Sequence, residues 1–316
     1  MTQRWDAQPY AAPYDAPVRS GRWAWMIVIG LAVGVAAYLF FIRTYTGQYL
    51  ENAALLGAKQ NATAAEMTDA LDDLRVISYV SLGVAIIAVG IVGLARKSWR
   101  IGAAGAFVIA GATITTELLK KVILPRPDLA QTYADNASNS FPSGHTTIAM
   151  SILVALLVVT SYRWRGIVMF FAVAWATAVG SATVTARWHR FSDTLGADMV
   201  ALIFGAIALI WLYKHGEIRR VEGKTHPWRV IYIVILSGVG VVTLALGATL
   251  SGLTIARWDV GWGATTLASN AVADPEFSRN LFFAAQSLAL AFSILSALWI
   301  WATLHRLESH TVTPGR

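Results

Sequence analysis

Residues 141–162 read FPSGHTTIAMSILVALLVVTSY, a polar turn followed directly by an apolar stretch from Thr146 to Tyr162. An α-helix rises about 1.5 Å per residue, so about 20 apolar residues cross ~30 Å of hydrocarbon. Similar apolar stretches occupy residues 23–42, 76–95, 101–119, 166–186, 195–213, 230–250 and 281–303. The sequence therefore predicts an all-α, polytopic transmembrane bundle of about eight helices.

The composition is also typical of a membrane protein. The chain has 316 residues, of which 56% are hydrophobic and 14% charged, and its mean hydropathy is +0.55. Soluble domains usually carry about 25% charged residues. The first apolar stretch follows a polar, Pro-containing segment without a small-residue cleavage pattern, so we expect a retained helix behind a disordered tail at residues 1–22. The chain has no cysteine, which removes disulfides and thiol chemistry from consideration.

The net charge of +7 is unevenly distributed along the chain. When the connections are assigned alternately to two membrane sides, the side with both termini carries 15 Lys/Arg and 5 Asp/Glu, and the other side 10 and 13. Basic residues concentrate in cytoplasmic loops. We therefore expect a multi-pass protein of the cell membrane with cytoplasmic termini. The basic charge is a topology signal, and we expect no nucleic-acid partner.

Three long connections fall on the predicted extracytoplasmic side, at residues 43–75, 120–145 and 251–280. Long ordered loops usually carry function. Within the first, residues 48–58 and 64–74 mix apolar and acidic side chains, which is compatible either with short interfacial helices or with a solvated connection. The third, with Arg257, Trp258, Asp259 and Trp262, can line a substrate entrance, contact a partner or simply cover the outer face.

Pro142-Ser143-Gly144-His145 stands at the start of the stretch quoted above. Unpaired N–H groups and the positive dipole end of a helix favour an anion there. Ser143 can cap the helix or donate its hydroxyl, and Gly144 lets a ligand approach the backbone. The segment predicts a phosphate cradle beside the titratable His145, although taken alone it also fits an ordinary capped helix.

His189 and Asp193 are four residues apart at the start of another predicted helix. They therefore share one helix face, where the carboxylate can hold one ring nitrogen and leave the other free as a nucleophile or base. A polar pair on a solvated helix end has the same spacing. The presence of a second histidine, His145, near the same membrane side favours the catalytic interpretation.

Five cations accompany the histidines on this side, and several donors are what a phosphate dianion requires. Basic side chains near helix ends can equally extend towards the interface. The sequence has no HExxH, no paired-histidine ligand spacing and no dense carboxylate cluster in this region, so we expect neither a metal nor another cofactor. A serine nucleophile at Ser143 lacks the GxSxG context. The cations are Lys120, Lys121, Arg126, Arg187 and Arg190.

Together, the three clusters resemble the type 2 phosphatidic acid phosphatase (PAP2) superfamily. Its motifs are a lysine separated by six residues from Arg-Pro, then PSGH, then Ser-Arg, five residues, His, three residues and Asp. PSGH matches in full, and the His-x-x-x-Asp half of the third motif matches at His189 and Asp193. The resemblance covers residues 120–193.

The chain departs from these motifs at two places. The family lysine falls on Leu119, so we assign its role to Lys120, with Lys121 as a competitor. The expected Ser-Arg pair is replaced by Ala182 and Thr183. We expect Arg187, one helical turn beyond Thr183, to supply the missing guanidinium.

The resemblance implies a six-helix catalytic core at residues 23–213. A cytoplasmic linker would follow at 214–229, then two additional helices at 230–303 and a cytoplasmic tail at 304–316. It also implies that His189, oriented by Asp193, attacks phosphorus to form a phosphohistidine, and that His145 protonates the leaving oxygen. By the same resemblance, the phosphoryl oxygens are held by Lys120, Arg126, Ser143, Gly144 and Arg187, with Lys121 and Arg190 as additional candidates.

The resemblance implies hydrolysis of a membrane lipid phosphate or pyrophosphate at a metal-independent extracytoplasmic site, with the bilayer and its lipid as partners. One alternative is transfer of the phosphoryl group to a lipid or sugar hydroxyl. Another is a non-catalytic protein that binds or transports lipid phosphates, for which the intramembrane Asp198 is the most suggestive residue. The sequence leaves the lipid tail, the head group and the oligomeric state undecided.

Overall fold

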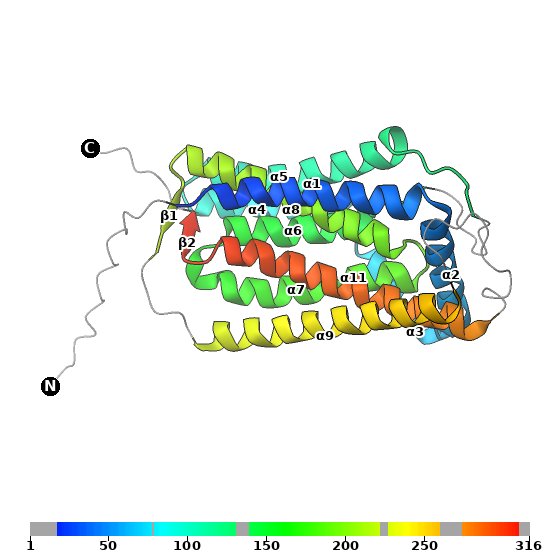
Figure 1. Cartoon of the computed structure of the whole chain (residues 1–316). Coiled ribbons are helices and arrows are strands. Elements are labelled where there is room, and N and C mark those ends of the chain that lie inside the picture. Colours follow the sequence, from blue (N-terminus) through cyan, green and yellow to red (C-terminus); the bar gives the residue numbers. More distant parts are fainter. Residues whose placement is uncertain (1–17, 78, 131–138, 222–226, 260–273, 310–316) are drawn as a thin grey trace, which may run out of the picture.

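The computed structural model describes residues 18–77, 79–130, 139–221, 227–259 and 274–309. Its long helices run roughly parallel to one another and form a bundle (Figure 1). This confirms the predicted all-α architecture. The long helices are α1 (Gly21–Ala37), α4 (Tyr79–Ala95), α5 (Trp99–Leu118), α6 (Gly144–Val159), α7 (Tyr162–Thr185), α8 (Phe191–Lys214), α9 (Pro227–Arg257) and α11 (Pro275–Thr303), and two π-helical turns, η1 (Tyr38–Ile42) and η2 (Leu119–Ile123), extend α1 and α5.

Each of the eight predicted apolar stretches falls on one of these helices. In the described part of the chain, six helices are long and apolar enough to cross a membrane by themselves. A seventh span is obtained if α3 (Ala64–Arg75) and α4, which meet at a 53° bend, are counted together. Helix α6 is apolar but has only 16 residues. The chain is thus a multi-pass membrane protein, and the count of eight spans stays a prediction.

Helix α8 forms the centre of the bundle and packs against α1, α5, α6 and α11. A helix that is apolar on all sides is expected to be buried, and most of α8 is. Helix α9 is the opposite case, because it packs mainly on α11 and exposes valines such as Val234 and Val241. At Gly247 of α9, an added Cβ would lie 2.6 Å from a side-chain atom of Leu288. The absence of a side chain there allows α9 and α11 to approach closely.

Helices α2 (Tyr45–Asn61) and α3 lie across one end of the bundle (Figure 1). The side chain of Thr44 caps α2 by accepting a hydrogen bond from the N–H of Gly47 at 3.0 Å. Both segments that were predicted to be either helical or solvated are therefore helical. Most residues of α2 are buried, largely against α11, so this helix is part of the packed structure rather than a solvated connection.

The opposite end of the bundle holds a two-stranded antiparallel sheet, in which Arg219 pairs with Glu308. The predicted linker supplies β1 (Ile218–Arg220), and the predicted C-terminal tail supplies β2 (Leu307–Ser309). Arg96 holds this sheet by an ion pair with Glu308 at 3.2 Å and a hydrogen bond to the carbonyl of Val159 at 2.9 Å. The rest of the predicted tails, at residues 1–17 and 310–316, and Trp262 in the third long connection lie outside the described residues.

Candidate active site

The starts of helices α6 and α8 meet beneath α2. Ser143 caps α6, because its Oγ accepts a hydrogen bond from the N–H of Thr146 at 3.3 Å. The N–H of Ser143 itself donates to the carbonyl of Asp193, in the first turn of α8, at 2.9 Å. Two helix N-termini, each with N–H groups free of intrahelical partners, are thus directed to one place. Such a place favours a bound anion.

His189 and Asp193 are brought together as their spacing predicts. The Nδ1 atom of His189 lies 3.3 Å from Oδ2 of Asp193, which also accepts the N–H of Arg190 at 2.8 Å. Asp193 is fully buried, and His189 is 8% exposed. With Nδ1 held by the carboxylate, the Nε2 atom of His189 is the ring nitrogen left for a reacting group.

His145 occupies the second position of α6, next to the histidine pair. The ring centroids of His145 and His189 are 6.2 Å apart, and that of Trp188 lies 5.3 Å from His145. His145 is partly exposed, whereas His189 is buried. The two imidazoles are close enough for a single phosphoryl group to contact both.

The two candidate lysines occupy different environments. Both pair with Glu117, Lys120 at 3.0 Å and Lys121 at 2.8 Å. The side chain of Lys120 is 17% exposed and that of Lys121 is 68% exposed. A Cβ added at Gly144 would lie 3.4 Å from Nζ of Lys120, which places this ammonium group against the start of α6. The geometry therefore favours Lys120 over Lys121 as a phosphate ligand.

Arg126 points into a buried polar region. Its two terminal guanidinium nitrogens are shielded from solvent and have no hydrogen-bond partner in the described part of the chain. Burial, followed by the neighbouring charge of Arg190, lowers the pKa of Arg126. Gln48 of α2 fixes the segment that follows, because its Nε2 donates to the carbonyl of Pro127 at 2.6 Å and its Oε1 accepts the N–H of Leu129 at 3.2 Å. A phosphate oxygen would satisfy the donors that Arg126 leaves open.

The two arginines next to His189 differ in their surroundings. Arg190 is 2% exposed and donates to Ser140 Oγ at 2.8 Å and to Asn52 Oδ1 at 3.3 Å, so it belongs to the buried site rather than to the membrane interface. Arg187 lies in the connection between α7 and α8 with a positive φ of 60°. Thr183, where the family arginine is expected, is fully buried within α7. The proposed replacement of that arginine by Arg187 stays a prediction.

Helix α2 contributes polar side chains that the sequence interpretation did not assign to the site. Glu51 is buried, and its Oε1 accepts the N–H of Ser192 at the start of α8 at 3.0 Å. Burial, and next the charge of Asp193, raises the pKa of Glu51 to about 7. Gln48, Glu51 and Asn52 follow the i, i+3, i+4 spacing of one helix face. This polar stripe, within the otherwise apolar QYLENAALL, is the sequence feature that could have assigned α2 to the site.

An apolar pocket of about 200 Å³ adjoins these polar groups. Its polar lining comes from Glu51, His189 and Arg190, together with Ser251 of α9. The rest of its wall is apolar and is contributed largely by η1, α2, α9 and α11, with Phe41, Leu55, Ile255, Leu281, Ala285 and Leu288 among its residues. A ligand with a charged group and an apolar chain would therefore find polar side chains and an apolar wall next to each other.

The chemistry of this arrangement is that of an anion site with an oriented imidazole. Three cationic side chains, Lys120, Arg126 and Arg190, surround the starts of α6 and α8. Among the residues described, His, Asp and Glu side chains form no group of three or more that could hold a metal ion. A developing negative charge on a phosphoryl group would be stabilised by these fixed donors.

Comparison with known proteins finds the same family over part of the chain. The model of the PAP2 superfamily matches residues 102–217, a segment that includes His145, His189 and Asp193 and confirms the resemblance drawn from the motifs. A solved structure, described as the first transmembrane PAP2 type phosphatidylglycerolphosphate phosphatase from Bacillus subtilis, is 22% identical, with a TM-score of 0.49. That match covers 61% of this chain and 96% of the other. No curated protein matches the chain.

Proposed function

We propose that this chain, whose residues 102–217 match the PAP2 superfamily, releases phosphate from a membrane lipid phosphate or pyrophosphate. The observation that carries the proposal is the position of the His189–Asp193 pair, which lies among buried cations on one side and beside an apolar pocket on the other. The cations suit a phosphate group, and the pocket suits the hydrocarbon attached to it.

In the proposed mechanism, Nε2 of His189 attacks phosphorus while the bond from phosphorus to the leaving oxygen breaks. Burial, and next the charge of His189, lowers the pKa of His145 to about 4, and a bound phosphate dianion favours its protonated form. His145 then donates a proton to the leaving oxygen, and a phosphohistidine forms on His189. Water then attacks phosphorus, His145 takes a proton from it, and inorganic phosphate leaves with His189 restored. Phosphoryl transfer depends mainly on positioning and on stabilising charge at the equatorial oxygens, which is the role we assign to Lys120, Arg126 and the N–H groups of α6.

We propose a lipid substrate because the wall of the 200 Å³ pocket is largely apolar. Helices α9 and α11, which contribute Ile255, Leu281 and Ala285 to it, lie outside residues 102–217. We propose that these additional helices hold the first part of the lipid tail while the phosphate stays at His189. The number of methylene groups accepted would then depend on side-chain size along α11.

The site is proposed to face the extracytoplasmic side. The opposite end of the bundle carries the described ends of the chain, with Lys214, Arg219 and Arg306, and the excess of basic residues in its connections is the pattern of cytoplasmic loops. A substrate would then approach from the outer leaflet.

The direct test is phosphate release by the purified full chain in detergent with EDTA, on a panel of phosphatidic acid, phosphatidylglycerophosphate and polyprenyl mono- and pyrophosphates. Wild type should release phosphate, His189→Ala should lose the activity, and His215→Ala, at the exposed far end of α8, should keep it. Activity that persists in His189→Ala would rule out this nucleophile. Product that forms only when a lipid or sugar hydroxyl is added would replace hydrolysis by transfer.

A second variant tests the tail pocket separately. Ala285→Leu should reduce kcat/KM for a lipid phosphate and leave a water-soluble phosphate ester without a hydrocarbon tail unaffected, because only the tail reaches α11. An equal loss on both substrates would assign Ala285 to the general packing of α11. An unchanged kcat/KM on both would place the tail elsewhere.

A further inference from the structure

A groove lies between the starts of α7 and α9, at the end of the bundle opposite the candidate active site. It has a volume of about 970 Å³ and adjoins a smaller cavity of about 180 Å³. The two spaces share Tyr162, Arg229 and Trp301 as lining residues. The larger volume is near the upper end of the ~300–1,000 Å³ range of ligand pockets. Neither the proposed reaction nor the family motifs use this region.

The long walls of the groove are apolar and aromatic. Phe170 and Phe171 of α7 and Ile235 of α9 line it and are exposed, and Trp228 at its mouth is 71% exposed. The hydroxyl of Tyr232 in α9 donates to the carbonyl of Met169 in α7 at 3.5 Å, which joins the two helices that border the groove. Because tryptophan and tyrosine prefer the level of lipid head groups, we expect the mouth of the groove at the membrane interface and the walls below it in the hydrocarbon.

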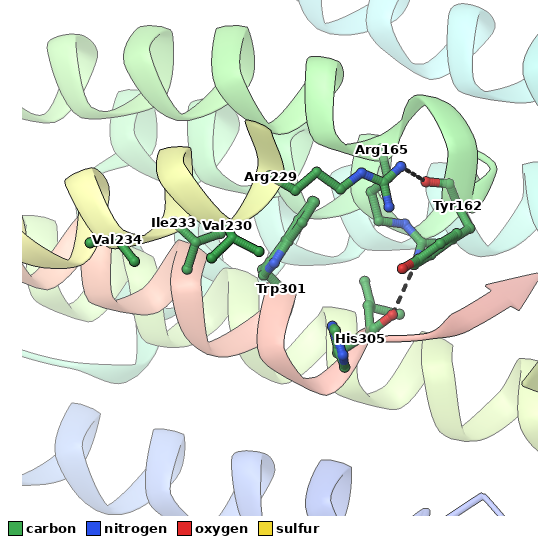
Figure 2. Close-up of a pocket in the computed structure, with 9 residues that line it drawn as sticks. Tyr162, Arg165, Arg229, Val230, Ile233, Val234, Trp301 and His305 are labelled. Carbon is green, nitrogen blue, oxygen red and sulfur yellow. Dashed lines mark hydrogen bonds between the residues drawn. The ribbon is translucent and has the colours of Figure 1, made fainter. Parts of the chain in front are cut away.

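Arg229 brings a positive charge to the mouth of the groove. Figure 2 shows its side chain extending from α9 towards Tyr162 and Arg165. Its guanidinium carbon lies 4.4 Å from the centroid of the Tyr162 ring, and the group donates to the carbonyls of Tyr162 and Arg163, the latter at 2.8 Å. Its stem packs against Gly166, where an added Cβ would lie 3.1 Å from Nε of Arg229. These contacts fix the position of the charge without neutralising it.

Two further arginines accompany Arg229. Arg163 lines the large groove, and Arg165 lines the small cavity. His305 also lines the small cavity, but burial, and next the charge of Arg306, lowers its pKa, so it adds no positive charge at neutral pH. Arg165 is 2% exposed and donates to the carbonyls of Thr160, Leu304 and Leu307, yet its Nε has no partner in the described part of the chain. Among the residues that the structure describes, neither space has an Asp or Glu in its lining. The site therefore combines a fixed positive head region with an apolar trough.

We propose that this groove binds one phospholipid with an anionic head group, taken from the leaflet opposite the candidate active site. The phosphate would lie at Arg229 and Arg163, and an acyl chain would follow Phe170 and Ile235 between the two helices. Basic pockets between transmembrane helices suit anionic head groups in this way. The bound lipid would fill the space that α9 leaves against α7 and would fix this additional helix to the core.

The test is native mass spectrometry of the full chain released from micelles that contain dioleoylphosphatidylglycerol or dioleoylphosphatidylcholine. Wild type should retain one phosphatidylglycerol in preference to phosphatidylcholine. At about 1 kcal/mol per basic residue near a membrane surface, Arg229→Gln should weaken retention roughly fivefold and the Arg163→Gln/Arg229→Gln double variant roughly 25-fold. Lys214→Gln, an exposed cation at the same end, and Arg126→Gln, in the candidate active site, should leave it unchanged.

Equal retention of both lipids would overturn the proposal, because the groove would then hold bulk lipid without recognising charge. A loss in Lys214→Gln as large as that in Arg229→Gln would assign the preference to general surface charge. A loss confined to Arg126→Gln would place the retained lipid in the candidate active site. Should Arg229→Gln not fold, Arg163→Gln decides by the same criteria, because its guanidinium lies over the neighbouring Trp164 and makes no buried contact.

Discussion

The main-chain N–H of Ser143 donates a hydrogen bond to the main-chain carbonyl of Asp193 at 2.9 Å. This bond joins the start of α6, which bears His145, to the first turn of α8, which orients His189. The helix end proposed to bind the anion and the helix that holds the proposed nucleophile are therefore joined directly through the main chain. Because main-chain atoms form this bond, replacing a side chain at the site does not remove it.

His145→Ala should affect substrates according to their leaving groups. For a lipid monophosphate, whose alkoxide must be protonated as it leaves, we expect kcat to fall roughly 10²–10⁴-fold, the usual contribution of general acid catalysis. A pyrophosphate has a leaving group that needs less protonation, so its loss should be smaller. Steady-state kinetics on the two substrates checks this, with His189→Ala as the comparison because it should abolish both reactions. Equal losses in His145→Ala would contradict the assigned role.

Lys120→Gln and Lys121→Gln form a matched pair that shares Glu117 as ionic partner. Removing the ammonium group that lies against Gly144 should lower kcat roughly 10²-fold, as the loss of one oxyanion donor does. The ion pair of the exposed Lys121 is screened by solvent, so its variant should stay within about twofold of wild type. Kinetics on one lipid phosphate measures both. A larger loss in Lys121→Gln would reverse the assignment.

Glu51→Gln should change how stability depends on pH. Burial raises the pKa of Glu51 from its ordinary value of 4.5 to about 7, so the folded state holds a proton that the unfolded chain has lost in this interval. The free energy of unfolding of wild type therefore falls as pH rises from about 4.5 to 7, whereas that of Glu51→Gln does not. Relative to wild type, the free energy of unfolding of the variant should increase by about 3 kcal/mol over this range.

The measurement for Glu51 is the thermal unfolding temperature in detergent at pH 5 and pH 8, compared with wild type. Asp73→Asn on α3 serves as the control, because Asp73 is exposed and its replacement should shift both temperatures equally. A difference between Glu51→Gln and wild type that stays constant with pH would mean that Glu51 is already ionised in the folded protein.

Ser293→Ala should destabilise the junction of α11 with α8. The Oγ of Ser293 donates to Oδ2 of Asp198 at 2.9 Å, and both residues are fully buried. Loss of this donor leaves a buried acceptor unsatisfied, which costs about 1–3 kcal/mol. Ser296→Ala, another buried serine of α11, is the matched control. If the two variants unfold at the same temperature in detergent, the bond from Ser293 contributes nothing to the junction.

The absence of cysteine makes the proposed orientation directly testable. Gln60 lies at the exposed end of α2, at the same end of the bundle as the candidate active site, and Lys214 lies at the opposite end; each is replaced by cysteine. A membrane-impermeant maleimide should label Gln60→Cys in intact cells and Lys214→Cys only after permeabilisation. The reverse labelling pattern would place the site on the cytoplasmic side.

The sequence by itself determined the helical bundle, because apolar stretches of membrane-spanning length leave few alternatives to a helix in hydrocarbon. It also determined the His189–Asp193 contact and the Ser143 cap. These are local relationships, since four residues make one helical turn and a cap acts on its own first turn. For the same reason, the spacing of Gln48, Glu51 and Asn52 contained a usable signal for one polar face of α2.

Only the tertiary structure decided which distant segments pack against these helix faces. The burial of Glu51 against α8, the anchoring of the Arg126 segment by Gln48 and the pairing of residues 218–220 with 307–309 all join parts distant in sequence. The choice between Lys120 and Lys121 also depended on the tertiary structure. The π-helical turn η2 changes the directions in which an α-helix would point these two side chains. Periodicity fixes a side chain's direction within its own helix, whereas packing decides which other helix lies in that direction.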